Sequence, residues 1–551
     1  MKKNILLFLL VLSQMTFGQT KITETEKLAA TCKVWGYLKY YHPKVANGDF
    51  NWDEKLFEVL PKIESAKNKE EYSAVIEKWI DDLRVVPTNK PLADDPKKDF
   101  FNENLNLDWT QKDKLFSKSL SNKLKFITEN RFQGANHYVN RDGKEVRFQF
   151  VNEQEYAEVL WTNKNLRLLT LFRFWNYVEY FFPYKYKMDQ KWDDALVEIL
   201  PYIIAPASEK EFLLAMREIS IKLNDTHAAT FNMQMMQYLG GEKYTAFGTK
   251  FIDDKAVITT IANDSLAKID DLKIGDVITK IDGITVAQKL DELLKYMQGS
   301  NRPAAILNGA LVMFTGNTDD FEVEFIRDNV TSVKKIHRYP NGKIKRSPPK
   351  NSPNWEILEN NIGYVKMNKV PKEEVPEMME KLKNTQAIIF DVRNRPTYTD
   401  FLVSEYLNPE PKPILRLLYQ DLSYPGRYYF SDEMEECGKI NTDYYKGKVI
   451  VLVNSGTHSF GEQTAMSLQT APNATVIGSQ TSGADGPNYY FKIIKGFDSS
   501  FTSAGVFYPN KKETQRIGIV PDIEVKPTIV GAQQGKDEVL DRAKLFAKNG
   551  K

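Results

Sequence analysis

The spacing of apolar and polar positions divides the chain into three parts. Residues 34–83 and 174–223 carry apolar side chains at helical spacing, with prolines marking the turns. Residues 239–337 change to short strand-like runs separated by turns, which predicts a small β-rich domain. From residue 355 onward strand-like and helix-like stretches alternate, which predicts an open α/β layer structure. We therefore expect a multidomain protein.

The two helical stretches are copies of each other. At a constant offset of 140 residues, segments 34–61 and 174–201 align without a gap and share at least seven identities. Each copy is predicted to form a helix, a proline-marked turn, a second helix and a third helix. The shared aromatic side chains are expected to form a core, with an aromatic ligand cage as the alternative. The identities include Trp35 with Trp175, Tyr37 with Tyr177, Tyr40 with Tyr180, Pro43 with Pro183, Trp52 with Trp192, Asp53 with Asp193 and Pro61 with Pro201.

The copies differ where their third helices end. The first continues into Arg84-Val85-Val86-Pro87 and the second into Asn224-Asp225-Thr226-His227. Only the second copy can therefore supply an imidazole at this place. Between the copies we expect a polar linker at residues 88–102, a helix at 111–129 and a hairpin that turns at Asp142-Gly143.

The β-rich part has the pattern of a peptide-binding module. Leu272, the run IGDVI at residues 274–278 and the run IDG at 281–283 resemble the PDZ-domain signature. Phe247 and Gly248 stand where such domains carry their carboxylate-binding loop. PDZ domains bind a peptide by strand addition, so the resemblance implies a peptide ligand. A β module without a ligand is the alternative.

The α/β part contains a candidate nucleophile. In the run KVIVLVNSGTHSFGE, Ser459 follows an apolar strand and begins a helix, where backbone N–H groups and the helix dipole stabilise negative charge. A serine at this position is also an ordinary helix cap, because Glu462 three residues later completes a capping box. The local pattern leaves both interpretations open.

The N-terminal segment, the charge balance and the cysteine count bear on targeting, on nucleic-acid binding and on disulfide formation. Residues 1–18 have a basic start, an apolar run and small residues before a cut at Gln19, which is typical of a signal peptide. The apolar run is shorter than the roughly 20 residues of a membrane span, so an anchor is the weaker alternative. The chain has 75 Lys and Arg against 73 Asp and Glu, which gives no basic field for nucleic acid. The two cysteines, Cys32 and Cys437, are too few for a disulfide scaffold, and their pairing stays open.

The motifs of the second half resemble the tail-specific, or C-terminal-processing, peptidase family. IGYVKM, FDVRNRP, VNSGTHSFGE, VIGSQTSGADG and RIGIVPDIEV follow the family's order behind a helical region and a PDZ module, from about residue 166 to the end. The resemblance implies a C-terminal catalytic domain of the ClpP/crotonase-like α/β fold. It also implies Ser459 as the nucleophile and no metal or organic cofactor.

The general base departs from the commonest form of the family. Many members use a lysine in a later Gly-rich turn, where this chain has Ala484, so another base must deprotonate Ser459. The branch that resembles the tricorn protease core uses a histidine from the helical part, preceded by a small hydroxyl residue, and a late glutamate. The resemblance implies His227 as the base, with Thr226 and Glu513 orienting it. His458, the neighbour of the nucleophile, is the main alternative.

The resemblance also implies an oxyanion site built from backbone N–H groups of Phe460 and Thr397. In much of the family the loop after residues 391–394 continues into paired glycines, whereas this chain reads Arg395-Pro396-Thr397-Tyr398. Loss of one such donor costs about 10²–10³ in rate. Weak activity is therefore expected.

These observations predict an exported serine endopeptidase, periplasmic or extracellular, that cleaves peptides or unfolded protein C-termini through an acyl-enzyme on Ser459. No nucleic-acid partner and no stable membrane span are expected. The alternative is a weak or inactive protein that binds peptides or hydrophobic ligands on the same scaffold. The tyrosine-rich segment 417–445 is expected to be a loop, either over the cleft or on the plain surface. The predicted domains are a signal peptide at 1–18, the first helical copy with its linker and hairpin at 19–160, the second copy with His227 at 161–238, the PDZ-like domain at 239–345 and the catalytic domain at 346–551.

Overall fold

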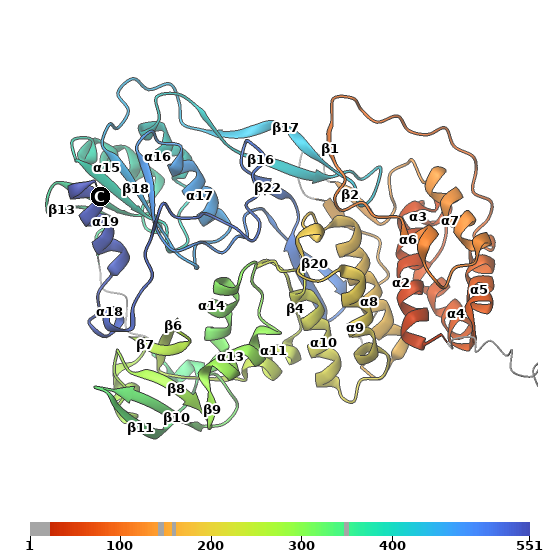
Figure 1. The fold of residues 1–551 in the computed structure, drawn as a ribbon, viewed down its shortest axis with the longest axis horizontal. Helices are drawn as coiled ribbons and strands as arrows, with labels where there is room; N and C mark the ends of the chain where they lie inside the picture. The colour runs from red at the N-terminus through yellow and green to blue at the C-terminus, as the bar shows by residue number, and fades with distance from the viewer. Residues whose placement is uncertain (1–21, 142–147, 157–160, 346–351, 551) are drawn as a thin grey trace, which may run out of the picture.

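The computed structural model describes residues 22–141, 148–156, 161–345 and 352–550. The helical first half lies at one end of the molecule and the α/β part at the other, with the green β module beside the latter (Figure 1). The predicted signal peptide and the turn at Asp142-Gly143 lie outside the described residues.

The two duplicated segments form the same series of helices at the same offset. Each begins with a long buried helix, continues through a short turn helix and ends with two amphipathic helices. The first copy contains α2 (Glu24–Tyr41), α3 (Pro43–Ala46), α4 (Trp52–Ser65) and α5 (Lys69–Asp81). The second contains α8 (Lys164–Phe181), the 3₁₀ turn η1 (Lys185–Lys187), α9 (Trp192–Ile204) and α10 (Glu209–Ile221).

The shared tryptophans exchange the same pair of hydrogen bonds in both copies. The indole N–H of Trp35 donates to the carbonyl of Trp52 at 3.3 Å, and the indole of Trp52 donates back to the carbonyl of Trp35 at 3.0 Å. Trp175 and Trp192 repeat this exchange at 3.1 and 3.0 Å. All four side chains are buried in one core, so they pack the helices and do not line a cage.

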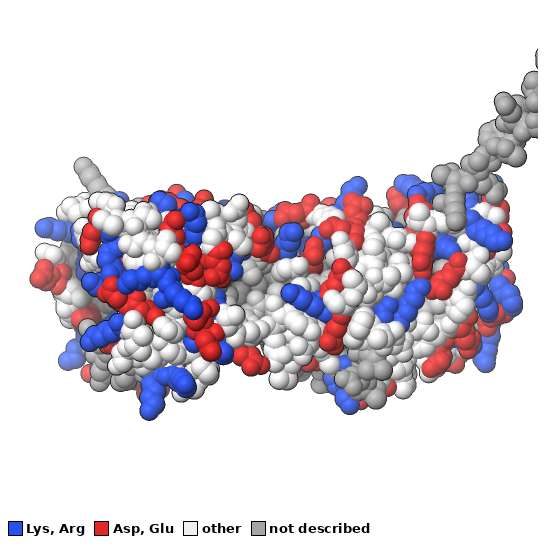
Figure 2. Space-filling view, turned by 90° about the horizontal axis from the view of Figure 1, so that it is seen from below, with Lys and Arg blue, Asp and Glu red and all other residues white. Residues whose placement is uncertain are grey.

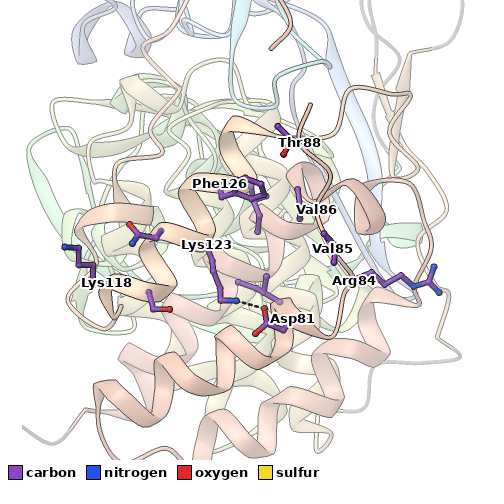
Figure 3. Close-up of a pocket in the computed structure, with 12 residues that line it drawn as sticks. Asp81, Arg84, Val85, Val86, Thr88, Lys118, Lys123 and Phe126 are labelled. Carbon is purple, nitrogen blue, oxygen red and sulfur yellow. Dashed lines mark hydrogen bonds and ion pairs between the residues drawn. The ribbon is translucent and has the colours of Figure 1, made fainter. Parts of the chain in front are cut away.

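Both copies end in the same left-handed turn, with φ of 75° at Arg84 and 50° at Asn224. The first copy then borders an open cavity of about 900 Å³ between the end of α5 and the helix α7 (Lys118–Glu129). Figure 3 shows Val85, which is 86% exposed, beside Phe126 at this cavity. The turn is thus common to both copies. The residues that follow it in the first copy border this open cavity.

The segment between the copies contains short elements. The helix predicted at residues 111–129 is two helices, because Ser117 caps a new helix by accepting from the N–H of Leu120. The elements are β1 (Asp99–Phe101), α6 (Trp109–Lys112), α7, β2 (Val139–Arg141) and β3 (Phe148–Phe150).

A buried histidine in the first copy should make the stability of the protein depend on pH. His42 is fully buried, its Nε2 has no hydrogen-bond partner, and burial followed by the charge of Lys44 lowers its pKa to about 4. Because the unfolded pKa is near 6.5, this site contributes stability above pH 6.5 that is lost as the pH falls toward 4. The second copy has Phe182 at this place. Between pH 7 and pH 4, we expect the unfolding free energy of His42→Phe to fall by about 2–3 kcal/mol less than that of the wild type.

Urea unfolding at both pH values measures this difference. His137→Gln, at a histidine that is not fully buried and has no acidic partner among the described residues, is the control and should follow the wild type. An equal loss in His42→Phe and wild type would contradict a neutral buried imidazole.

A parallel sheet forms the centre of the α/β part. Its order is β13-β14-β15-β18-β19-β23, and all neighbours are parallel except the antiparallel edge strand β13. The central strands are buried and apolar except for Asp391 and Lys448 at their ends, as expected for a sheet covered on both faces. The strands are β13 (Trp355–Leu358), β14 (Ile362–Lys366), β15 (Ala387–Asp391), β18 (Lys448–Val453), β19 (Ala474–Gly478) and β23 (Ile523–Glu524). The helices are α15 (Val375–Leu382), α16 (Asp400–Leu407), α17 (Phe460–Gln469), α18 (Ile529–Gln533) and α19 (Glu538–Asn549).

About half of the tyrosine-rich segment 417–445 is strand, so its prediction as a loop was wrong. It belongs to a sheet of order β1-β17-β16-β22, in which β1 comes from the linker between the helical copies. Tyr428 and Phe430 are buried in the aromatic core and Tyr429 between them is less buried, as in a strand with one covered face, whereas residues 432–436 are all exposed. The strands are β16 (Lys412–Gln420), β17 (Tyr428–Cys437) and β22 (Gly505–Phe507).

The β module is an antiparallel sheet of order β11-β10-β8-β7-β6, with β6 at one edge. Its own core contains Phe247, Ile278 and Phe325. The strands are β6 (Phe247–Ile252), β7 (Lys255–Ile261), β8 (Val277–Ile281), β9 (Ile284–Thr285), β10 (Asp320–Arg327) and β11 (Val330–His337). The helices are α11 (Met233–Gly240), which precedes the sheet, α12 (Asp264–Ile269), α13 (Val286–Leu294) and α14 (Arg302–Met313), and β5 (Lys243–Tyr244) pairs with β12 (Tyr339–Pro340).

A third small sheet joins the second helical copy to the α/β part. β4 (Ala229–Phe231) pairs with β21 (Phe497–Thr502), which pairs with β20 (Asn488–Ile494). The antiparallel register sets Ala229 opposite Ser500. Continued by two residues, this register brings His227 opposite Thr502.

The surface carries both signs of charge. Figure 2 shows acidic and basic side chains interspersed over the face seen from below, with neither sign dominating it. Both cysteines are buried free thiols, which answers the question of their pairing. Among the described residues no helix is both long and apolar enough to cross a membrane.

Candidate active site

Ser459 stands at a sharp turn between the central strand β18 and α17. Its backbone has φ of 54° and ψ of −125°, a strained conformation for a residue with a side chain. The turn places Ser459 at the N-terminus of α17, where the helix dipole favours developing negative charge. A strained, non-glycine residue at such a position is typical of a functional site.

Glu462 holds this turn in place. Its buried carboxylate accepts from the N–H of Ser459 at 3.1 Å and from the N–H groups of Gly483 and Ala484 at 2.7 and 2.9 Å. The hydroxyl of Thr481 donates to it as well. Burial raises the pKa of Glu462, and these four donors stabilise its ionised form. The helix cap predicted from the sequence thus fixes the backbone of the candidate nucleophile to the Gly-rich turn.

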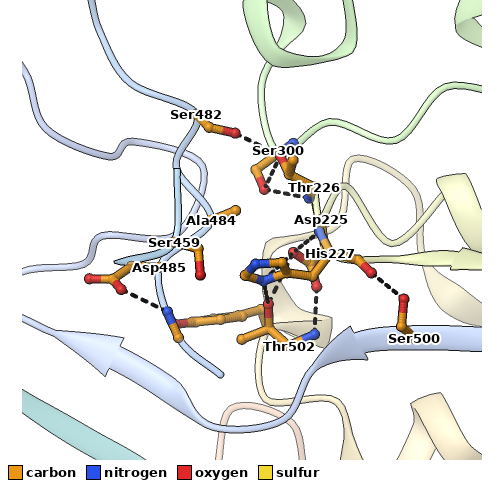
Figure 4. A network of polar contacts seen from close by, with 12 residues as sticks. Asp225, Thr226, His227, Ser300, Ser459, Ser482, Ala484, Asp485, Ser500 and Thr502 are labelled. Carbon is orange, nitrogen blue, oxygen red and sulfur yellow. Dashed lines mark hydrogen bonds and ion pairs between the residues drawn. The ribbon is translucent and has the colours of Figure 1, made fainter. Parts of the chain in front are cut away.

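His227 faces Ser459 from the helical part. Figure 4 shows its imidazole and the Ser459 side chain turned toward each other across the gap between the two domains. His227 lies between α10 and β4, and its side chain is only 8% exposed. Pairing of β4 with β21 carries the residue into the α/β part.

Thr502 and Asp225 orient the imidazole, and the sequence analysis assigned a role to neither. His227 Nδ1 lies 2.9 Å from the Thr502 hydroxyl, which donates to Asp225 at 3.1 Å. Asp225 also accepts the N–H of Thr502 at 2.8 Å and that of His227 at 3.1 Å. A hydroxyl that donates to the carboxylate accepts the proton of Nδ1, which leaves Nε2 unprotonated. The adjacent Asp225-Thr226-His227 run could have suggested the aspartate, but only strand pairing reveals Thr502.

The pKa of His227 is lowered, chiefly by burial. The negative charge of Asp225 opposes this shift, whereas the positive charges of His458 and Arg395 add to it. The imidazole is therefore neutral near pH 7, which is the form that can accept a proton.

His458 turns away from this arrangement. Its Nδ1 lies 3.1 Å from the carbonyl of Gly456, within its own loop. The main alternative base is therefore engaged with the backbone that precedes the nucleophile.

Thr226 does not orient His227, contrary to the expectation. Its hydroxyl lies 2.9 Å from that of Ser482 in the catalytic domain and accepts the N–H of Ser300 at 2.9 Å. Ser300 belongs to the connection between α13 and α14. Thr226 thus joins the helical part, the β module and the Gly-rich turn, because its side chain leaves the backbone on the side away from the imidazole (Figure 4).

Glu513 does not orient His227 either. Its carboxylate accepts from the hydroxyl of Tyr186 at 2.8 Å and pairs with Lys187. Both partners come from the turn that follows α8. Glu513 therefore fastens the α/β part to the second helical copy, and the orienting hydroxyl and carboxylate come from Thr502 and Asp225 instead.

Only one of the two predicted oxyanion donors is available. Phe460 is the first residue of α17, so its N–H has no acceptor within the helix. The N–H of Thr397 donates to the carbonyl of Met367 at 2.9 Å, and its hydroxyl bonds to the carbonyls of Met367 and Val370. These contacts turn Thr397 into the structure, so the prediction of a donor there was wrong. The ring of Tyr398 instead packs on Phe460 at 4.4 Å between centroids.

The position expected to hold a lysine in the family contains a buried alanine with a structural role. The carbonyl of Ala484 accepts the N–H of Ser459 at 3.1 Å. The next residue, Asp485, is buried, and one of its carboxyl oxygens has no hydrogen-bond partner. Burial and the neighbouring Glu462 raise the pKa of Asp485. In this turn a buried carboxyl group with a raised pKa, rather than a lysine, lies near the nucleophile (Figure 4).

Phe247 and Gly248 begin the edge strand β6 of the module. Phe247 is buried against Phe314, and Gly248 pairs with Thr260 of β7. A cavity of about 980 Å³ extends from β6 and α14 to the loops at residues 393–395 and 454–456 of the catalytic domain. The second of these loops ends three residues before Ser459. The cavity therefore joins the module to the loop that leads to the candidate nucleophile.

The fold and this site define a multidomain protein with a parallel α/β domain of the serine-peptidase type. Residues 361–525 match the model of peptidase family S41. The resemblance to tail-specific serine peptidases that the sequence predicts is thus confirmed for this part of the chain.

One curated relative and two solved structures are also similar to this chain. The Carboxy-terminal-processing protease of Bartonella bacilliformis is 25% identical over 282 residues, which cover 49% of this chain and 58% of that protein. The chain thus spans 58% of the length of this curated relative. Mature CPAF complexed with lactacystin has a similar fold, with a TM-score of 0.54 at 13% identity over 70% of this chain and 98% of that one. Mature CPAF alone gives a TM-score of 0.54 at 12% identity over 69% and 97%.

Proposed function

We propose that this protein is an exported serine endopeptidase that cleaves peptides or unfolded protein C-termini through an acyl-enzyme on Ser459. The observation that carries the proposal is the strained Ser459 at the start of α17, facing a neutral His227 whose Nδ1 is fixed by Thr502 and Asp225. Nε2 of His227 accepts the proton of the Ser459 hydroxyl as the oxygen attacks the substrate carbonyl, and returns it to the leaving amine. The N–H of Phe460 stabilises the oxyanion.

Substrate capture is assigned to the β module. β6 is an edge strand with unpaired backbone groups, so an extended peptide can add to it as a further strand, as in a PDZ domain. The helix α14 lines the same cavity through Pro303, Ile306 and Leu307, which offer apolar contacts for side chains of the peptide. From there the chain can pass along the cavity to Ser459. A peptide or an unfolded tail, but not a folded domain, fits this route.

The first test is labelling with a fluorophosphonate probe followed by mass spectrometry. Only a serine activated by a neighbouring base reacts readily, so we expect the probe on Ser459 in the wild type and none in Ser459→Ala. Ser455→Ala, in the loop before the nucleophile, is the matched control and should label normally. Labelling that persists in Ser459→Ala would overturn the proposal. Mapping the fragments of an unfolded substrate then identifies the cleaved bonds.

A second candidate function is ligand binding without turnover. The observation that favours it is that the N–H of Thr397 donates to the carbonyl of Met367. Of the two predicted oxyanion donors, only the N–H of Phe460 is then left. Loss of one donor lowers the rate by about 10²–10³ and leaves peptide binding intact. Unlabelled, folded wild type that still binds peptides on β6 would support this function instead.

A further inference from the structure

Arg395 is an exposed cation without an acidic partner at the edge of the candidate active site. It follows β15, and its guanidinium makes one hydrogen bond, to the hydroxyl of Tyr398 at 3.4 Å. No carboxylate among the described residues lies within ion-pair distance of it. Arg393, two residues earlier, differs sharply, because it binds both Asp391 and Asp537. The charge of Arg393 is therefore used within the fold, and that of Arg395 is available to a ligand.

Arg395 borders the space that a substrate must cross. It lines the 980 Å³ cavity between β6, α14 and the catalytic loops. Its charge also reaches His227, whose pKa it helps to lower, although burial is the larger cause. Arg395 thus lies between the cavity and the imidazole.

Other charged groups of the cavity do not take this role. Asp537 is bound to Arg393, and Glu538 accepts from the N–H and the hydroxyl of Thr528. Lys526 pairs with Glu524. Lys250 and Lys536 also line the cavity, and no ion pair is recorded for either among the described residues. Among the cavity's cations, however, Arg395 is the one whose charge acts on His227.

We propose that Arg395 is a specificity-determining residue that binds a carboxylate of the substrate close to the bond being cleaved. This inference rests on the proposed peptidase function and names a chemical class of substrate for it. A guanidinium binds a carboxylate through two parallel hydrogen bonds, which a neutral amide cannot match. The carboxylate comes either from an aspartate or glutamate side chain or from the C-terminus of the peptide.

The carboxylate would also assist catalysis. His227 becomes positively charged when it takes the proton of Ser459, and the positive Arg395 opposes that change. An anion bound to Arg395 offsets this repulsion while the transition state forms. Acidic substrates should therefore gain in kcat as well as in KM, because the offset matters most when the imidazolium exists.

The test uses matched peptides that differ only in charge. One series places glutamate or glutamine at successive positions along the peptide, and a second pairs a free C-terminal acid with the C-terminal amide. We expect one acidic peptide to exceed its neutral counterpart by about 10–100-fold in kcat/KM for the wild type. Arg395→Gln should bring this ratio close to 1, and Arg395→Lys should restore part of it. Lys526→Gln, another cation of the cavity, is the matched control and should keep the wild-type ratio.

A binding measurement tests the role of Arg395 independently of the proposed peptidase activity. The affinities of the Ser459→Ala protein for the same peptide pairs, measured by fluorescence anisotropy with and without Arg395→Gln, need no turnover. A preference for the acidic peptide that disappears with Arg395→Gln supports the role of Arg395 even if hydrolysis is absent. Equal affinities and equal kcat/KM for acidic and neutral peptides, or a preference unchanged in Arg395→Gln, would overturn it. A preference in the side-chain series or in the C-terminal series identifies the source of the carboxylate.

Discussion

Replacing His227 by alanine should lower kcat/KM of the proposed peptidase by about 10⁴-fold, because the Ser459 hydroxyl then has no base to take its proton. The imidazole is neutral near pH 7 and faces Ser459, with Nδ1 held by Thr502. Residual activity would come from the oxyanion donor and from substrate binding. Steady-state cleavage of a peptide substrate and the rate of fluorophosphonate labelling at Ser459 both measure this loss.

His458→Ala is the informative comparison. Its Nδ1 bonds to the carbonyl of Gly456 within its own loop. We expect a loss of less than about 10-fold, since no proton transfer passes through this residue. A collapse of labelling in His458→Ala with full labelling in His227→Ala would reverse the assignment of the base. Thermal unfolding of both variants checks that they are folded.

Removing the groups that orient His227 should have the second largest effect. Thr502→Val keeps the shape of the side chain and deletes the acceptor for Nδ1, and Asp225→Asn weakens the carboxylate that polarises the threonine hydroxyl. Loss of the tautomer that leaves Nε2 unprotonated lowers kcat by about 10²–10⁴-fold, with a smaller change in KM. Measuring kcat and KM separately distinguishes this from a loss of substrate binding.

Glu513→Gln serves as the matched control for these two variants. Its carboxylate binds Tyr186 and Lys187, so its loss should affect the attachment of the helical part more than the chemistry. We expect kcat to fall by less than about 10-fold, with a lower melting temperature. A drop in kcat as large as that of Thr502→Val would restore the relay first predicted from the sequence, with Glu513 as its acid.

The sequence predicted the local elements well wherever a single segment determined them. The 140-residue offset reproduced both sets of helices, down to the reciprocal indole hydrogen bonds of the tryptophans. The buried strands around residues 387–391 and 448–453 were evident from unbroken apolar runs, which parallel sheets require. The turn that carries Ser459 followed from an apolar strand joined to a helix start.

The sequence failed where a role depended on the direction of a side chain. Thr226 and Glu513 stand at the positions matched by the resemblance, yet one joins three domains and the other pairs with Tyr186 and Lys187. The segment 417–445 gave no clear strand signal by itself, because its partner β1 comes from a linker more than 300 residues earlier. Such pairings carry no local pattern.

The sequence by itself determined the family, the nucleophile's turn and the presence of one candidate imidazole after the second helical copy, since each is written in a contiguous run of residues. Only the tertiary structure decided what acts on that imidazole. The pairing of β4 with β21 sets Thr502 opposite His227, and the contacts of Thr397 and Arg395 arise from how loops pack. Hydrogen bonds between segments hundreds of residues apart depend on register and burial, which are properties of the folded chain.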